Sequence, residues 1–189
     1  MKKLIATINM TLDGFCDHDV MTPNDETYQH FNELLRSVDT ALYGRKTYQL
    51  MEYWRTVAKK PTGDRQKDEF ALLMDNLPKI VFFRTLKDLE WKTARVAKRS
   101  LREEVIGLKQ SGNRGGKDIM VGSPGLIASL TQLNLIDEFQ LVIHPTVVGS
   151  GLPLFRNITE KVNLKLLKTK TFRFGAVAMY YEPVEKGNF

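Results

Sequence analysis

The sequence contains very little cysteine and histidine. Cys16 is the single cysteine, so no internal disulfide and no cysteine-based metal cluster can form within these 189 residues. The three histidines, His18, His30 and His144, lack the i, i+4 spacing that places two imidazoles on one helix face. We therefore predict no metal site. We expect His18 and His30 at the surface and His144 in packing at a strand end.

Long hydrophobic runs are also missing. No apolar stretch approaches the ~18 residues that a membrane-spanning helix needs. The first ten residues include two lysines, but Thr7 and Asn9 interrupt their apolar run, which favours a strand over a signal peptide. We expect no membrane span and a cytoplasmic location.

Composition and length are typical of one globular domain. Hydrophobic residues make up 42% of the chain and charged residues 26%, which are ordinary values for a folded, soluble domain. A chain of 189 residues is long enough for one well-buried core and short for two. Because no repeat or low-complexity linker interrupts it, we predict a single domain over residues 1–189.

The net charge of +6 has a local source. Nine lysines and arginines lie between Lys87 and Lys117, against four acidic residues. This segment is either a face that follows nucleic-acid phosphates or a solvated surface. No aromatic stacking pattern accompanies the charges, so the solvated surface is favoured and a nucleic-acid partner is not expected.

Strands alternate with helices along most of the chain. Apolar and β-branched runs predict strands at 3–10, 39–43, 79–83, 94–97, 118–121, 139–144, 164–172 and 176–182. Helical periodicity predicts helices from Thr22, from Thr47, at 70–77, from Ser100 and at 126–133. The pattern indicates an α/β fold with a mostly parallel central sheet flanked by helices and antiparallel C-terminal edge strands.

Two helix starts carry recognisable signals. Thr22 is a candidate N-cap, with Pro23 as the first helical residue and two acidic residues in the first turn. Ser100 and Glu103 have the spacing of a capping box.

A pair of cations occupies an unfavourable place. Arg45 and Lys46 lie where the strand ending at Gly44 meets the next helix. A helix N-terminus carries partial positive charge, which disfavours each cation by roughly 0.3–1 kcal/mol. Either the side chains extend into water or an anionic ligand offsets the cost.

Two further strand ends carry related chemistry. Arg84 and Thr85 follow the strand at 79–83, and a small glycine-containing turn, Gly122–Gly125, follows the strand at 118–121. Ligands of open α/β sheets bind beyond the carboxyl ends of the strands, where the ends of parallel strands share one edge. Guanidinium groups there would suit a phosphate. Taken singly, each signal is weak: a glycine such as Gly44 is more often a plain helix entry, and Ser123–Pro124 is more often a cap than a phosphate site.

In combination these stretches resemble a known family. The chain is similar to the dihydrofolate-reductase-like superfamily, and most closely to the reductase domain of bifunctional riboflavin-biosynthesis deaminase-reductases and their stand-alone relatives. The matching stretches are Ile8–Phe15, Val38–Tyr48, Met120–Leu126, Leu135–Phe139 and Pro145–Phe155.

The resemblance implies a domain that binds NADPH and passes a hydride to a heterocyclic or imine-like acceptor. It assigns two sets of residues to the cofactor. The loop over the nicotinamide, after the first strand, contains Leu12, Gly14 and Phe15. The segments after three later strands contain Gly44, Arg45, Lys46, Thr47, Arg84, Thr85, Gly122, Ser123, Pro124, Gly125 and Leu126. The 2′-phosphate of NADPH between Arg45 and Arg84 would account for the cations at the helix start.

Substrate and proton donor are less defined. The position at which true dihydrofolate reductases carry an acidic residue is Tyr28 here, which argues against dihydrofolate. The acidic candidates for catalysis are Asp13, Asp25 and Glu26, although Asp13 is equally suited to forming a turn. Tyr28, Phe31 and Trp54 are candidates for the acceptor pocket, and their helical spacing suits core packing as well.

Three functional hypotheses follow. The first is an NADPH-dependent reductase acting on a small pterin, riboflavin precursor or similar acceptor. The alternatives are a cofactor-binding protein without turnover and a basic nucleic-acid-binding protein. Because relatives pair through their C-terminal strands, the resemblance also implies a homodimer through residues 164–182.

Overall fold

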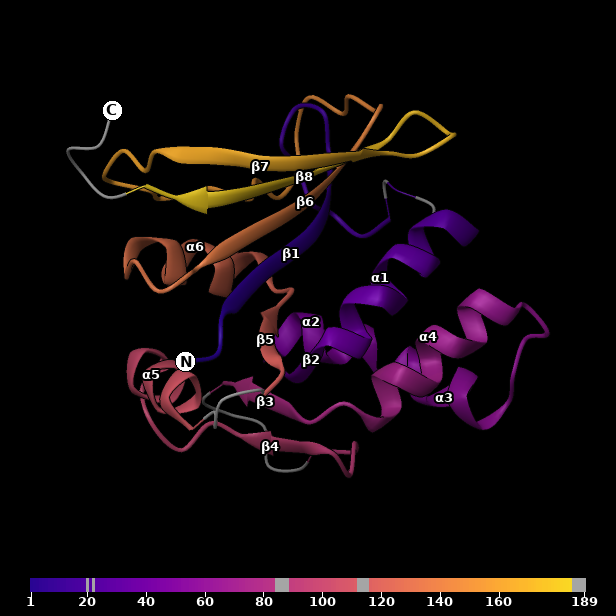
Figure 1. Ribbon diagram of the computed structural model, residues 1–189. Helices are drawn as coiled ribbons and strands as arrows, with labels where there is room; N and C mark the ends of the chain where they lie inside the picture. Colours follow the sequence, from indigo (N-terminus) through magenta and orange to yellow (C-terminus); the bar gives the residue numbers. More distant parts are fainter. Residues whose placement is uncertain (20, 22, 84–88, 112–115, 185–189) are drawn as a thin grey trace. The chain divides into compact units, whose positions relative to one another are not determined.

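The computed structural model describes the chain except residues 20, 22, 84–88, 112–115 and 185–189 (Figure 1). Its contacts divide the chain into two compact units. The first unit is Met1–Lys2 with Pro23–Met120, and the second unit is Lys3–Thr22 with Val121–Phe189. The prediction of one domain stays a prediction. No helix in the described part of the chain is both long and apolar enough to cross a membrane.

Parallel strands form the sheet of the first unit. They are β2 (Val38–Gly44), β3 (Lys79–Phe82) and β4 (Ala94–Val96), with β3 in the middle, and β5 (Asp118–Val121) carries the chain into the second unit. Gly44 pairs with Phe82, so β2 and β3 end together at one edge of the sheet. This register agrees with the expectation from the sequence that the segments after β2 and β3 leave the sheet at the same edge.

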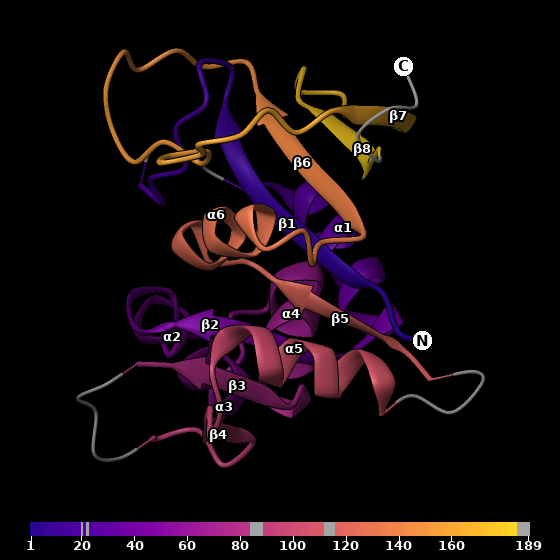
Figure 2. The ribbon, with the colours of Figure 1, turned by 90° about the vertical axis from the view of Figure 1, so that its left-hand side faces the viewer.

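Five helices accompany these strands. They are α1 (Asp25–Ser37), α2 (Arg45–Met51), α3 (Tyr53–Lys59), α4 (Arg65–Asn76) and α5 (Leu101–Gln110). Both α1 and α3 pack against α4. Helix α5 lies alongside β3 and β4 (Figure 2), and Glu104 of α5 forms an ion pair with Arg95 of β4. The predicted capping box is confirmed, because Ser100 and Glu103 exchange both hydrogen bonds.

Some local predictions for this unit are wrong. The N-cap of α1 is Asn24, whose Oδ1 accepts a hydrogen bond from Thr27 N at 3.1 Å, while Thr22 lies outside the described residues. Helix α4 begins earlier than predicted, because the Asp64 carboxylate caps it through Gln66 N and Lys67 N. His30 is 3% exposed and not at the surface.

Antiparallel edge strands complete the second unit. Its strands are β1 (Leu4–Thr11), β6 (Glu138–His144), β8 (Val177–Pro183) and β7 (Leu164–Thr171), in that spatial order. β1 pairs with β6 in parallel, whereas β6 with β8 and β8 with β7 are antiparallel. Helix α6 (Pro124–Gln132) lies along β1 and β6 (Figures 1 and 2). The predicted fold class, a mostly parallel sheet with antiparallel C-terminal edge strands, is confirmed.

A lysine is buried at the start of β3. Lys79 is 1% exposed, and its Nζ donates hydrogen bonds to the carbonyl oxygens of Met74 and Leu77 and to Thr93 Oγ1. The first two carbonyls lie at the C-terminal end of α4, where the helix dipole favours a cation. Nζ also lies 3.9 Å from the centre of the Trp91 ring. Burial nevertheless lowers the pKa of Lys79 to about 7.

This pKa predicts an unusual dependence of stability on pH. The folded protein releases the Lys79 proton near pH 7, whereas the unfolded chain holds it up to about pH 10.5. Between these values the unfolded state binds more protons, so the free energy of unfolding rises with pH, by up to about 1.4 kcal/mol per pH unit. Denaturant unfolding measures this. The free energy of unfolding of wild type, relative to that of Lys79→Met, should increase from pH 7 to pH 9.5. A difference independent of pH would contradict this.

Candidate functional site

The carboxyl ends of β1 and β6 define one edge of the second unit. Thr11, the last residue of β1, pairs with His144, the last residue of β6. The segments that follow therefore leave the sheet side by side. This is the edge at which open α/β sheets bind their ligands.

These two segments, residues 12–17 and 145–156, form what we call the double loop. Backbone hydrogen bonds connect them along their length: Leu12 N donates to Thr146 O at 2.9 Å, Cys16 N to Leu152 O at 2.9 Å, and Leu154 N to Gly14 O at 3.1 Å. Neither segment is part of a regular sheet beyond one isolated bridge between Phe15 and Pro153. The shape of each segment therefore depends on the other.

The Asp13 carboxylate holds the double loop together. It accepts hydrogen bonds from Thr11 Oγ1 at 2.7 Å, Gly149 N at 2.7 Å and Val148 N at 3.1 Å. These hydrogen bonds, that from Thr11 first and then that from Gly149, lower the pKa of Asp13. Asp13 is thus ionised near neutral pH and used as a backbone acceptor. Its predicted catalytic role remains a prediction.

A second carboxylate makes a comparable contact. Asp17 Oδ2 accepts a hydrogen bond from Leu152 N at 2.6 Å. Gly151, the residue before Leu152, has a φ of +150°, and a Cβ atom added to it would overlap the Asp17 carboxylate. Only glycine fits this close approach.

Cys16 lies within the double loop. Its thiol is buried and donates a hydrogen bond to Leu152 O at 3.1 Å. Burial raises the pKa of the thiol to about 11, so very little reactive thiolate exists near neutral pH. Cys16 is therefore a packing residue.

The start of α6 lies close to an arginine of the double loop. Ser123 is the buried N-cap, Pro124 is the first helical residue, and Gly125 follows in the first turn with the half-buried Leu126. A Cβ atom on Gly125 would lie 3.4 Å from Arg156 Nη2, so the missing side chain leaves room for the guanidinium group. Arg156 is exposed.

Sequence reasoning missed Arg156. It directly follows the last stretch that resembles the reductase family, Pro145–Phe155, so the signal was its place in the chain. The structure brings it to the turn Gly122–Gly125, which the resemblance assigns to the cofactor. Gly122, the first residue of that turn, is half-buried at the end of β5.

One face of β1 carries polar side chains. Residues two apart on a strand share a face, so Thr7, Asn9 and Thr11 lie together. Phe139, which pairs with Ala6, lines a cavity with Thr131 of α6, which places the polar face of β1 away from α6. His144 Nε2 and Asn9 Oδ1 are hydrogen-bonded at 3.0 Å. Burial lowers the pKa of His144, so its ring is neutral near pH 7.

In the first unit, the predicted phosphate contacts lie at the start of α2. Gly44 is the N-cap without a side-chain hydrogen bond, and Arg45 and Lys46 are exposed in the first turn, followed by the half-buried Thr47. That turn contains no acidic residue. Arg84 and Thr85 lie outside the described residues, so their predicted convergence with Arg45 stays a prediction.

The predicted substrate residues fall into two places of the first unit. Tyr28 and Trp54 belong to an aromatic cluster with Phe70, with ring centres 4.7 to 5.8 Å apart. Phe31 contacts the ring of His30 instead. All three predicted residues are half-buried, which suits packing as well as a ligand. Asp25 and Glu26 occupy the first turn of α1, where their negative charges interact favourably with the helix dipole.

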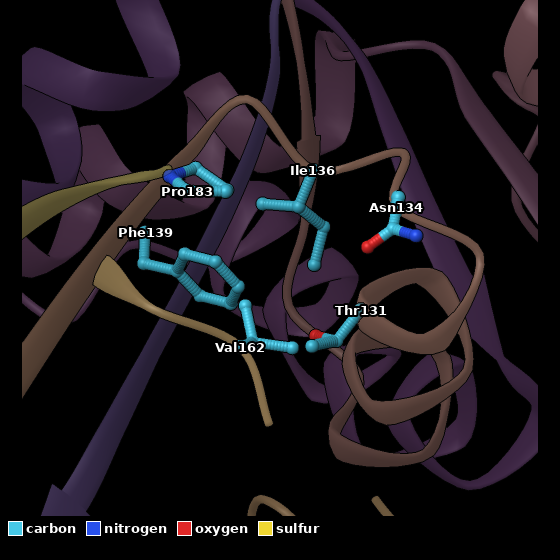
Figure 3. A pocket seen from close by; sticks show the side chains of 6 residues that line it. All are labelled: Thr131, Asn134, Ile136, Phe139, Val162 and Pro183. Carbon is cyan, nitrogen blue, oxygen red and sulfur yellow. The ribbon is translucent and has the colours of Figure 1, made fainter. Parts of the chain in front are cut away.

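A small pocket in the second unit is distinct from these residues. Figure 3 shows Ile136, Phe139 and Val162 pointing toward one another, with Thr131, Asn134 and Pro183 around them. Its volume is about 40 Å³, which is enough for a water molecule and far too small for a dinucleotide.

Comparison with known proteins places the chain in a family. The model of the RibD C-terminal domain matches residues 2–178. The chain belongs to this family. Uncharacterized protein YyaP of Bacillus subtilis (strain 168) is 35% identical over 188 residues, which cover 95% of this chain and 94% of that protein.

Solved structures share the fold. A protein assigned to riboflavin biosynthesis from Shewanella sp. PV-4 has a TM-score of 0.73 at 19% identity, covering 98% of this chain and 100% of that one. A dihydrofolate reductase from Enterococcus faecalis, complexed with NADP(H) and RAB-propyl, has a TM-score of 0.65 at 14% identity, covering 97% of each chain. At these identities the likeness shows the fold alone, and this fold is the one that the resemblance predicted. The match to the RibD C-terminal domain confirms the expected relation to the reductase domain of riboflavin-biosynthesis enzymes.

Two glycine variants test the packing of the double loop. Gly149→Ala introduces a side chain at a φ of +74° with open space around it, whereas Gly151→Ala also overlaps Asp17. Both should lower the free energy of unfolding, the first by about 1 kcal/mol for left-handed backbone strain and the second by about 3 kcal/mol or more. Thermal or denaturant unfolding measures both. Equal losses would mean that the Asp17 contact does not constrain the loop.

Proposed function

We propose that the protein is an NADPH-dependent reductase that transfers a hydride to a small heterocyclic acceptor, such as a pterin or a riboflavin precursor. Membership of the RibD C-terminal domain family supports the reductase class. The observation that carries the proposal is the position of Arg156 beside Gly125 at the start of α6. A guanidinium group next to the first turn of a helix suits a phosphate group.

Each unit by itself carries groups suited to one part of a phosphorylated dinucleotide. Arg156 and the first turn of α6 would hold its pyrophosphate, since Gly125 leaves the approach open. Arg45 and Lys46, exposed in a helix turn without acidic residues, would bind the additional 2′-phosphate of NADPH. An unphosphorylated ribose would leave these cations with the unfavourable helix dipole. NADPH is therefore favoured over NADH.

The double loop would shield the reacting centre. When bound, the cofactor supplies a hydride from its nicotinamide ring, and the protein orients the acceptor and excludes water. Leu12, which is 65% exposed, and Phe15 are held by the contacts of Asp13 and Asp17. A segment fixed by two carboxylates keeps its shape when a ligand binds, which lowers the ordering cost.

Turnover separates the reductase from its first alternative. A protein that binds NADPH as a sensor would show the same cofactor affinity and no oxidation. Absorbance at the NADPH band, followed with a panel of pterin, pyrimidine and quinone acceptors, distinguishes the two. Nucleic-acid binding is less supported, because no aromatic stacking pattern accompanies the basic segment in the sequence.

Two arginine variants test the cofactor assignment. Arg45→Ala should weaken NADPH by about 10- to 100-fold and NADH hardly at all, since one charge-assisted contact is worth about 1.5–3 kcal/mol. Arg156→Ala should weaken both cofactors equally, because both carry the pyrophosphate. Calorimetric titration measures the affinities. Arg102→Ala, an exposed arginine on α5, is the matched control and should change neither.

The outcomes for the two arginines are independent. If Arg45→Ala loses affinity for NADPH and NADH equally, Arg45 does not contact the 2′-phosphate, and the proposal of a reductase still holds. Retained affinity for both cofactors in Arg156→Ala would remove the observation on which the proposal depends.

We also propose that the protein is a homodimer that acts in the cytoplasm. β7 is last in the strand order of the second unit, and Leu166 and Leu167 on it are 49% and 43% exposed. An edge strand with exposed leucines is a natural pairing surface.

Sedimentation tests the dimer. Wild type should sediment as a dimer at micromolar concentration, and Leu166→Glu combined with Leu167→Glu as a monomer with an unchanged circular dichroism spectrum, because charge on the strand opposes pairing. Leu72→Glu, which changes a leucine of α4 that is 51% exposed, is the control. A monomeric wild type would refute this assignment.

A further inference from the structure

The first unit contains a pocket at the amino ends of its strands. This is the opposite end of β2 and β3 from Gly44 and Phe82, where the cofactor contacts are proposed. The pocket has a volume of about 280 Å³, close to the lower end of the roughly 300–1,000 Å³ typical of small-molecule sites. It is lined by residues of β3, β4 and α5 with the segments before them, and Figure 2 shows these three elements side by side.

Its lining combines an apolar floor with a polar rim. The buried Ile80 and the half-buried Leu108 form the floor, and the exposed Lys92 and Arg95 form the rim. Pro78 adds exposed apolar surface, and Thr40 adds a buried hydroxyl. A small apolar ligand with one polar end is the chemistry that such a lining recognises.

Of the cations that line the pocket, one is exposed and has no ion pair among the described residues. Arg95 is paired with Glu104, and Lys2 with Asp39, the neighbour of Thr40, at 2.6 Å. Lys79 points its Nζ to the carbonyl oxygens of Met74 and Leu77. Lys92 is exposed, and within the part of the chain that the structure describes it has no ion-pair partner.

Arg95 keeps capacity for a ligand despite its ion pair. Its Nη2 donates to Glu104 and its Nη1 makes a long contact of 3.4 Å with Val96 O, while a guanidinium group has five N–H donors. A carboxylate at the rim would accept hydrogen bonds from both Arg95 and Lys92.

We infer that this pocket is a second binding site, distinct from the proposed cofactor site, for a small organic monocarboxylate with an aromatic or branched apolar body. Lys92, the exposed cation of the lining without an ion pair in the described part of the chain, matches one negative charge, whereas inorganic phosphate and a nucleic-acid backbone bring more than one. The apolar floor contributes affinity that an inorganic anion does not gain. This assigns a role to part of the basic segment between Lys87 and Lys117.

Benzoate is a suitable probe, with benzyl alcohol as its neutral analogue and inorganic phosphate as an anion without an apolar body. Titration of the ¹⁵N-labelled full chain should show saturable shifts of the amide signals of Thr93, Ala94 and Leu108 with benzoate. The same signals should respond at least tenfold more weakly to benzyl alcohol and to phosphate. Equal responses to all three probes, or no response to benzoate, would overturn the inference.

Variants locate the contact. Lys92→Gln should weaken benzoate about tenfold by removing one charge-assisted contact, and Leu108→Ala should weaken it several-fold by shrinking the floor. Lys98→Gln, an exposed lysine of the same segment, is the matched control and should leave the affinity unchanged. Equal weakening by Lys92→Gln and Lys98→Gln would indicate a general charge effect and overturn the site.

NADPH affinity provides an independent check. Lys92→Gln should leave the binding of NADPH unchanged, since Lys92 lies at the opposite end of the strands from Arg45. If Lys92→Gln weakens both NADPH and benzoate, the two ligands do not bind at separate sites, and the inference of a second site is wrong. Failure of benzoate binding alone would leave the proposed reductase untouched.

Discussion

Backbone amides bound by two aspartates are the constraint on which the candidate site of the second unit depends. Asp13 accepts from Val148 and Gly149, and Asp17 accepts from Leu152, so two segments more than a hundred residues apart are fixed against each other. Without these acceptors the amides would be left to water and the segments would be free to separate. Arg156 is the last residue of the double loop, so its place beside Gly125 depends on the same contacts.

The order of strands and helices was predictable because it rests on local patterns. Apolar runs located β3 and β5, and the capping box located the start of α5. Errors arose where two signals competed over a few residues. Thr22 and Asn24 are both residue types that make good N-caps, and the structure shows the Asn24 side chain accepting a hydrogen bond from Thr27 N. His30 was expected outside, but a helix residue is buried or exposed according to what packs on its face, which the sequence of α1 alone does not state.

The site was predictable to a different degree in each unit. In the first unit, the position of Arg45 in the first turn of α2 follows from the strand that ends at Gly44, and the sequence contains both signals. In the second unit, the closeness of Arg156 to Gly125 depends on the path of a loop whose shape is set by Asp13 and Asp17. Those contacts join residues distant in the chain. A single sequence carries no pattern that reveals them.

The polar face of β1 is the least expected feature of the second unit, and it argues for a role beyond packing. Thr7 is 2% exposed, and its Oγ1 has no hydrogen-bond partner among the described residues. An unpaired buried hydroxyl costs about 1–3 kcal/mol, which an apolar side chain of similar size would avoid. The same face holds the Asn9–His144 hydrogen bond and ends at Thr11, where the double loop begins. These polar groups lower stability and lie along β1 toward the edge of the sheet where ligands bind. This pattern is expected of a strand that contacts a ligand in addition to packing in the core. The opposite face of β1, with the buried Ile8 and Met10, is apolar.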